Sequence, residues 1–219
     1  MRLTCIGHAC FLVEGDAGPR ILLDPYQPGA FQGRMGLRAF TEPVDVVVST
    51  HDHLDHFHLD PAFGAPDVVR ATATACGIEF RGVKLPHDEV EGAKRGFVTG
   101  FRFAIDGLSV VHPGDLGRVP NPEEARVLAP VDVLLLPVGG TFTVGPEEAA
   151  RTVEALRPRV VVPMHYLWPT VRLALQPIDD FLAVARRRGW PIEDAASPLE
   201  FRKEALPEGP RVVILPPTH

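Results

Sequence analysis

The stretch His51-Asp52-His53-Leu54-Asp55-His56 constrains this chain more than any other part of its sequence. It places three histidines and two aspartates within six residues, directly after the apolar run Val44–Thr50. Imidazole and carboxylate groups that leave water need polar partners, so such a cluster is not ordinary packed core. A bound metal ion would provide those partners, and the fold would then have to bring further ligands to this point.

The spacing within the motif supports a metal site. The preceding run is rich in valine and bounded by Pro43, which predicts a buried strand. Side chains two residues apart on extended chain point to the same side, so His51 and His53 can converge on one ion. Asp55 and His56 follow where the chain must turn, and they can face a second point nearby. The alternative is a solvated, histidine-rich loop without metal.

The pattern His-x-His-x-Asp-His after a strand that ends in threonine resembles the signature of the metallo-β-lactamase superfamily. Further motifs resemble the small bacterial metal-dependent hydrolases of the ascorbate-6-phosphate lactonase-like (UPF0173-type) group. These motifs are Gly7–Glu14, Gly114-Asp115, Pro137–Thr143 and Pro163–Tyr166, within a match from about residue 3 to about residue 168. The resemblance implies an α/β fold, the αββα sandwich of two mixed β-sheets flanked by helices. The lactonase relatives assemble into oligomers, and a homo-oligomer is one state compatible with this chain.

Length, charge and cysteine content narrow the class of protein. The 219 residues suit one α/β domain, so we expect a single metallo-β-lactamase-like domain over 1–219. The net charge of −6 offers no electrostatic surface for nucleic acid, and we expect a small-molecule substrate. No apolar run could span a membrane and no leader pattern opens the chain, which favours the cytoplasm. Three cysteines without a Cys-x-x-Cys pair indicate neither disulfides nor a thiolate zinc site.

Local patterns predict most of the secondary structure. Strands are expected at 2–6, 10–15, 20–24, 44–50, 67–70, 78–85, 97–105, 108–112, 131–137, 159–163, 199–203 and 211–215. The dipeptide Asp106-Gly107 predicts a hairpin between two of these strands. Helices are expected at 122–128, 146–156 and 177–188. The segment 26–42, with several glycines and prolines, is expected to be a loop that covers or lines a pocket.

The resemblance also implies ligands for two metal ions. The first ion would take three histidines, and the second would take one aspartate and two histidines. The first set is His51, His53 and His87, and the second set is Asp55, His56 and His165. Asp115, in a turn after a predicted strand, is the candidate to bridge both ions. His112 competes with His87 for the third position on the first ion, since strand ends alone do not separate them.

Imidazole and carboxylate ligands without thiolate suit zinc, and also manganese or iron. With two divalent ions, the predicted reaction is hydrolysis of a lactone, ester or amide by a metal-bridging hydroxide. Asp55 is a candidate catalytic residue, and His8 or His112 is a candidate for proton transfer to the leaving group. His8 has an alternative role as an ordinary turn histidine. Other interpretations are a phosphodiesterase of the same chemistry, a mononuclear iron oxygenase and a metal-binding protein without activity.

Overall fold

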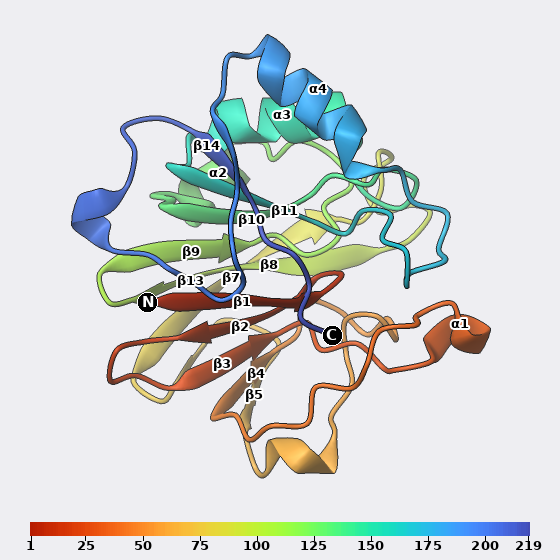
Figure 1. Ribbon diagram of the computed structural model, residues 1–219, viewed down its shortest axis with the longest axis vertical. Coiled ribbons are helices and arrows are strands. Elements are labelled where there is room, and N and C mark those ends of the chain that lie inside the picture. Colours follow the sequence, from red (N-terminus) through yellow and green to blue (C-terminus); the bar gives the residue numbers. More distant parts are fainter.

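Two β-sheets stack face to face in the computed structural model, which describes residues 1–219 (Figure 1). The six-stranded sheet has the order β13 (Leu199–Glu200), β1 (Arg2–Gly7), β2 (Cys10–Glu14), β3 (Arg20–Leu23), β4 (Val46–Val48) and β5 (Asp67–Val69). The eight-stranded sheet has the order β12 (Ile192–Asp194), β14 (Arg211–Ile214), β11 (Val160–Met164), β10 (Val133–Pro137), β9 (Leu108–His112), β8 (Phe97–Ile105), β7 (Ile78–Pro86) and β6 (Ala73–Ala75). Both sheets combine parallel and antiparallel pairs, as predicted.

The strand that precedes the histidine motif, β4, is buried on both faces. Val46, Val47 and Val48 each expose 1% of their surface or less. They pair in parallel with β3 on one side and β5 on the other. A strand covered on both faces needs a continuous apolar run, which the three valines provide. The strand is shorter than the predicted 44–50, although the backbone N–H groups of Asp45 and Ser49 still donate to Arg20 of β3 and Val69 of β5.

The predicted hairpin joins β8 and β9. Ile105 pairs with Leu108 across its turn. Asp106 and Gly107 have φ values of 50° and 73°, and both central residues of a type I′ turn require positive φ. The hairpin ends at His112, so the turn that carries Asp115 starts at the carboxyl end of β9.

Three helices pack against the outer face of the eight-stranded sheet: α2 (Pro122–Leu128), α3 (Pro146–Leu156) and α4 (Ile178–Arg187) (Figure 1). The Asn121 side chain caps α2 by accepting hydrogen bonds from the backbone N–H groups of Glu123 and Glu124. Val153 of α3 and Phe181 of α4 belong to the apolar cluster on this face of the sheet. The three predicted helices are confirmed to within one residue at each end.

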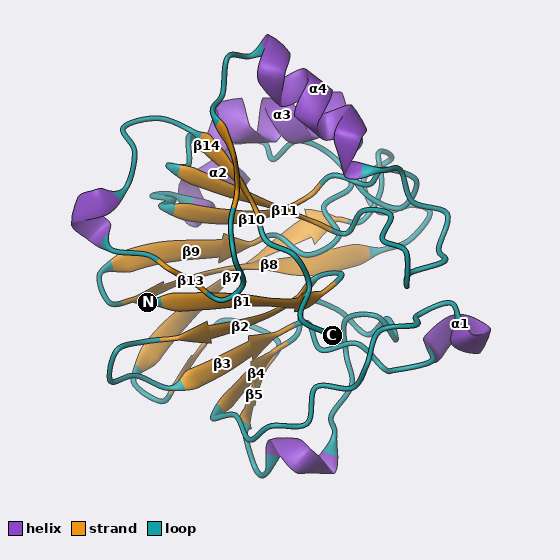
Figure 2. Cartoon of the chain, viewed as in Figure 1, coloured by secondary structure: helices purple, strands orange, loops and turns teal.

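The outer face of the six-stranded sheet is covered differently (Figure 2). The segment 26–44 crosses it mostly as loop, with the short helical turn α1 (Ala30–Gly33), and a second turn, η1 (Pro61–Phe63), follows β4. Buried Met35, Leu37 and Phe40 pack against side chains of β1 to β4. The predicted fold class is confirmed, with irregular chain covering most of this outer layer.

The main core lies between the two sheets. It contains four phenylalanines that each expose 2% of their surface or less, Phe11, Phe80, Phe101 and Phe103. Complete burial of a phenylalanine side chain stabilises a fold by about 1.5–3 kcal/mol. The strand ends that carry the predicted site residues are therefore fixed by a core that packs on both sheets.

A few elements differ from the sequence-based expectation. The edge strands β6 and β12 have three residues each and were not predicted. The strand expected at 199–203 pairs only at Leu199 and Glu200, and the short helical turn η2 (Lys203–Ala205) follows. None of the helices combines the length and the apolar character required to cross a bilayer.

Candidate metal centre

Strand ends from both sheets meet at one edge of the sandwich. The residues that follow these strands are His8 after β1, Asp24 after β3, His51–His56 after β4, His87 after β7, Asp115 after β9 and His165 after β11. Three of them, His8, Asp24 and His165, have positive φ values of 57°, 42° and 54°. Residues other than glycine adopt such values rarely, and they persist where surrounding contacts hold them. The backbone therefore turns sharply at this edge.

The first group of potential ligands contains His51, His53, His87 and Asp115, whose ligand atoms lie within 4.8 Å of one another. His53 Nδ1 lies 3.0 Å from His51 Nε2 and 3.4 Å from His87 Nε2. Two nitrogens bound about 2.0–2.1 Å from one tetrahedral zinc ion would lie about 3.3 Å apart. These imidazoles therefore have the spacing that a shared ion requires.

The second group contains His8, Asp55, His56 and His165, again with ligand atoms within 4.8 Å of one another. All four residues are buried. Asp55 Oδ2 lies 3.2 Å from His8 Nε2, 3.6 Å from His56 Nε2 and 4.0 Å from His165 Nε2. The structure thus brings His8 to the three residues expected around the second ion.

Asp115 lies between the two groups. Its Oδ1 is 3.1 Å from His56 Nε2, and its Oδ2 is 3.2 Å from His165 Nε2. The same Oδ2 is 3.5 Å from His87 Nε2 in the first group. One carboxylate therefore faces histidines of both groups, as a bridging ligand must.

Asp24 orients two of the histidines through hydrogen bonds at their Nδ1 atoms, although no sequence pattern singled it out. The buried carboxylate accepts hydrogen bonds from the Thr50 hydroxyl at 2.7 Å and from His56 Nδ1 at 2.7 Å. The Thr50 Oγ1 in turn accepts from His51 Nδ1 at 2.9 Å. Both rings direct Nδ1–H at Thr50 or Asp24, so Nε2 of each faces the ligand groups and is the nitrogen that would bind an ion in place of a proton. The only sequence signal for Asp24 is its place at a predicted strand end before Pro25.

His112 joins neither group. Its Nε2 donates to the carbonyl oxygen of Ala9 at 2.9 Å, and its Nδ1 accepts from the backbone N–H of Gly114 at 3.1 Å. The ring is buried and both nitrogens are occupied, so it has neither a free lone pair nor a free proton. The expectations that His112 ligates the first ion or passes a proton do not fit this geometry, and His87 takes the place in the first group.

Burial and neighbouring charges shift the protonation of the site. Burial and the nearby His165 lower the pKa of His8 to about 4, and burial and His56 lower the pKa of His51 to about 3. Burial opposes the charged form of Asp115, but His165 and His56 hold its pKa well below the usual range. Burial also opposes a charge on His56, yet the carboxylates led by Asp115 raise its pKa well above the usual value. Buried carboxylates here thus require a positive charge close by.

Several buried polar atoms at the site have no hydrogen-bond partner. They are His8 Nδ1, His56 Nε2, His87 Nδ1, Asp115 Oδ1 and both ring nitrogens of His165. His56 Nε2 and Asp115 Oδ1 are close, but their geometry is not that of a hydrogen bond. An unpaired buried polar group costs roughly 1–3 kcal/mol. Three of these atoms, His56 Nε2, Asp115 Oδ1 and His165 Nε2, lie among the ligand groups, which indicates a site suited to a cation. Nitrogen and carboxylate donors without thiolate fit zinc, manganese or iron.

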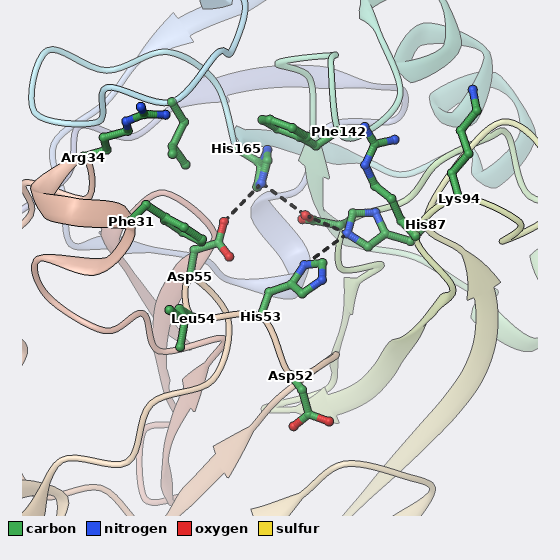
Figure 3. Close-up of a pocket in the computed structure, with 13 residues that line it drawn as sticks. Phe31, Arg34, Asp52, His53, Leu54, Asp55, His87, Lys94, Phe142 and His165 are labelled. Atoms are coloured by element: carbon green, nitrogen blue, oxygen red, sulfur yellow. Dashed lines mark hydrogen bonds and ion pairs between the residues drawn. The ribbon is translucent and has the colours of Figure 1, made fainter.

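A cavity of about 740 Å³ opens beside the two groups (Figure 3). This volume lies within the roughly 300–1,000 Å³ that is typical of small-molecule sites. The ligand candidates in its wall are His53, Asp55, His87, Asp115 and His165. The remaining lining residues are the apolar Phe31, Leu54, Phe142 and Leu173 and the charged Arg34, Asp52, Lys94 and Arg95. The loop 26–42 therefore does line the pocket, through Phe31 and Arg34.

A single carboxylate shapes the loop that carries two of these cations. Asp88 accepts hydrogen bonds of 2.7–3.0 Å from four backbone N–H groups, including those of Lys94 and Arg95. Desolvation opposes its charge, but the backbone donors, with that of Arg95 the strongest, lower the pKa of Asp88 to about 2. The loop 88–96 is thus folded around Asp88, which places Lys94 and Arg95 at the cavity.

Comparison with known proteins gives the family. Residues 2–165 match the family described as "Beta-lactamase superfamily domain". A UPF0173 metal-dependent hydrolase from Methanoculleus marisnigri is 34% identical over an alignment of 213 positions, gaps included, that covers 85% of this chain and 89% of the relative. A UPF0173 metal-dependent hydrolase from Pyrococcus furiosus is 31% identical over an alignment of 245 positions, gaps included, that covers 99% of this chain and 97% of the relative.

A solved structure extends the similarity to the whole fold. The crystal structure of a proposed Zn-dependent hydrolase of the metallo-β-lactamase superfamily from Thermotoga maritima has a TM-score of 0.77 and 31% identity. The alignment covers 98% of this chain and 97% of that protein. This chain therefore belongs to the metallo-β-lactamase superfamily, in its UPF0173 group, and is a metal-dependent hydrolase.

Proposed function

We propose that this hydrolase cleaves a lactone, ester or amide bond of a small molecule with two divalent metal ions, zinc being the first candidate. The observation that carries the proposal is the position of Asp115 between two groups of histidines, in the wall of a cavity. The proposed ligands of one ion are His51, His53 and His87, and those of the other are Asp55, His56 and His165, with Asp115 shared.

When bound, two divalent ions lower the pKa of a shared water towards neutrality and polarise the bond under attack. The protein's own contribution begins with the orientation of the ligands. Asp24, directly and through Thr50, holds the Nδ1–H groups of His56 and His51, so Nε2 of each ring is the nitrogen left for an ion. Without that hydrogen-bond chain, either ring could present an N–H where a lone pair is needed.

Asp55 is the residue best placed to handle a proton. It lines the cavity, and its Oδ2 lies 3.2 Å from His8 Nε2. Burial and His165 lower the pKa of His8 to about 4, so His8 is neutral at pH 7 and donates a hydrogen bond that holds the carboxylate. Asp55 can then accept a proton from the attacking water and pass it to the leaving group. His8 acts through Asp55, since its own side chain does not line the cavity.

The first test is the metal content of protein purified without added metal or chelator, measured by elemental analysis. Two equivalents of zinc or manganese per chain, with metal-dependent hydrolysis of at least one lactone, ester or amide in a panel, are the expected result. One equivalent of iron without hydrolytic activity would contradict the proposal and favour the oxygenase interpretation.

A matched pair of histidine variants tests the ligand assignment. His53→Ala removes an exposed member of the first group, so it should reduce both metal content and hydrolysis. His58→Ala is the control, because His58 lies in the same segment but belongs to neither group. Equal metal content in the two variants would contradict the assignment.

A further inference from the structure

The cavity beside the metal centre contains arginines without partners. Three cationic side chains line it, Arg34, Lys94 and Arg95. Lys94 forms an ion pair with Glu89, whereas the guanidinium groups of Arg34 and Arg95 make no hydrogen bond or ion pair in the structure. A guanidinium presents several N–H donors in a fixed plane that matches an oxyanion such as carboxylate or phosphate.

The carboxylates of the same cavity are already engaged. Asp52 pairs with Arg70, and Asp55 accepts from His8. Asp115 lies among the histidines of the two ligand groups. None of the three lies within ion-pair distance of either guanidinium, so the two exposed arginines stay available to a ligand in the cavity.

Arg95 is positioned by its own loop. Its backbone N–H donates to Asp88 Oδ2 at 2.7 Å, within the set of hydrogen bonds that folds the loop 88–96. Its guanidinium carbon lies 5.4 Å from the centroid of the Phe142 ring. Contact with a ring face restrains the plane of a guanidinium while its N–H groups at the edge stay available.

Arg34 reaches the cavity from the other side. In Figure 3, Arg34 and Phe31 lie on one side of His165, and Phe142 and Lys94 lie on the other. The backbone at Arg34 is anchored, because its carbonyl accepts a hydrogen bond of 2.8 Å from the N–H of Arg172. The two free guanidinium groups thus belong to opposite walls, with the metal ligands between them.

Apolar side chains accompany the two arginines. Phe31 shortly precedes Arg34, and Leu173 directly follows Arg172, whose N–H binds the Arg34 carbonyl. Phe142 lies against Arg95. The whole protein has a net charge of −6, so its long-range field does not favour an anion. Affinity for an anion must therefore arise locally, from these two side chains and from the metal centre.

We propose that this cavity selects an organic anion: a molecule whose carboxylate or phosphate group binds Arg95 or Arg34, joined through an apolar body to the bond that is hydrolysed. The inference rests on the proposed hydrolytic function for the reacting end of the substrate. It adds the chemical class of the group at the far end, which the geometry of the metal ligands does not specify.

Three phenyl esters that differ only at the end of the acyl chain test this specificity. Phenyl pentanoate ends in methyl, the monophenyl ester of glutaric acid ends in carboxylate, and phenyl 4-phosphonobutanoate ends in phosphonate. Water cleaves each to phenol and a carboxylic acid. We expect kcat/KM of the metal-loaded enzyme to be about tenfold higher for at least one anionic ester than for phenyl pentanoate, as a charged hydrogen bond implies.

Arginine variants assign the preference to the cavity. Arg95→Ala or Arg34→Ala should reduce the anionic-to-neutral ratio of kcat/KM by about tenfold. Arg126→Ala, which removes an exposed and unpaired arginine of α2, changes the net charge equally and should leave the ratio unchanged. No preference for either anionic ester, or a preference that survives in both cavity variants, would overturn the inference. The carboxylate and phosphonate esters show which oxyanion the site prefers.

A binding measurement separates this inference from the proposed function. Calorimetric titration of the metal-loaded protein compares glutarate with pentanoate, which share one carboxylate and differ in the second. Tighter binding of glutarate that is lost in Arg95→Ala or Arg34→Ala supports the anion site even if no ester is hydrolysed. Hydrolysis of phenyl pentanoate together with equal binding of the two acids would refute the anion site and leave the hydrolytic function standing.

Discussion

Replacing Asp24 by asparagine tests how the metal centre is organised. Asp24 Oδ2 accepts two hydrogen bonds, from the Thr50 hydroxyl and from His56 Nδ1, each at 2.7 Å. The substitution keeps the shape of the side chain but puts an N–H₂ donor in place of one oxygen. At least one buried donor then faces another donor. Where the Nδ1–H of His56 loses its acceptor, the tautomer that is protonated at Nε2 becomes more favourable. That tautomer has no lone pair for a ligand role.

The expected magnitude follows from the hydrogen bonds that are lost. A hydrogen bond to a charged group contributes about 1.5–3 kcal/mol, so the metal-free variant should unfold with a free energy lower by a similar amount. Loss of the side chain that hydrogen-bonds to a metal ligand typically reduces metal affinity by about 10- to 100-fold, and we expect this range for Asp24→Asn. Thr50→Val, which removes only the hydroxyl behind His51, should have a smaller effect on the same affinity.

Metal affinity can be measured by competition with a chromogenic chelator, and the fold can be checked by circular dichroism. The matched control is Asp45→Asn, at the opposite end of β4, where the carboxylate accepts a hydrogen bond from the backbone of Arg20. Asp45→Asn should bind metal as the unmodified protein does. If Asp24→Asn were folded and bound metal within about threefold of that control, the role assigned to Asp24 would be wrong.

Three further outcomes are expected. His165→Ala should lower the metal content from two ions to one in elemental analysis, and two retained ions would show that the second group does not bind as proposed. The pKa of Asp88 is about 2 in the fold against an ordinary 3.8, so its stabilisation of loop 88–96 is complete above about pH 4 and is lost as pH falls towards 2. Hydrogen-exchange protection of the Lys94 and Arg95 amides should fall over that range in the unmodified protein and should be low throughout in Asp88→Asn. Equal protection in the unmodified protein and in Asp88→Asn would contradict this role of Asp88. Gly117→Ala should destabilise the protein by about 1–3 kcal/mol in urea unfolding, because its Cβ would lie 2.0 Å from the Asp88 nitrogen, and an unchanged midpoint would refute that packing.

Elements with strong local patterns could be predicted from the sequence. The hairpin of β8 and β9 has a turn dipeptide that requires positive φ, and α3 begins with proline and two glutamates. The edge strands β6 and β12 were missed because three residues are too few to show alternation. Their pairing depends on a neighbouring strand, which is a tertiary property.

The site could be predicted only where residues share a motif or a strand end. The motif at 51–56, with His87, Asp115 and His165, was available from the pattern and its resemblance to a family. Asp24 was missed because its contact with His56 depends on the parallel pairing of β3 with β4. Arg34 and Arg95 were missed for a related reason: both stand in loops without periodicity, and only the folded chain brings them to one cavity.

The second ligand group also links distant parts of the chain. Asp55 and His56 follow β4 and His165 follows β11, so an ion held by these three residues would join segments far apart in the sequence. Because the three ligands meet only in the folded chain, the free energy of binding such an ion would add to the stability of the fold. This link also imposes an order during synthesis, because the second group lacks a member until β11 has left the ribosome. Metal loading would therefore be a late event that completes folding of the chain.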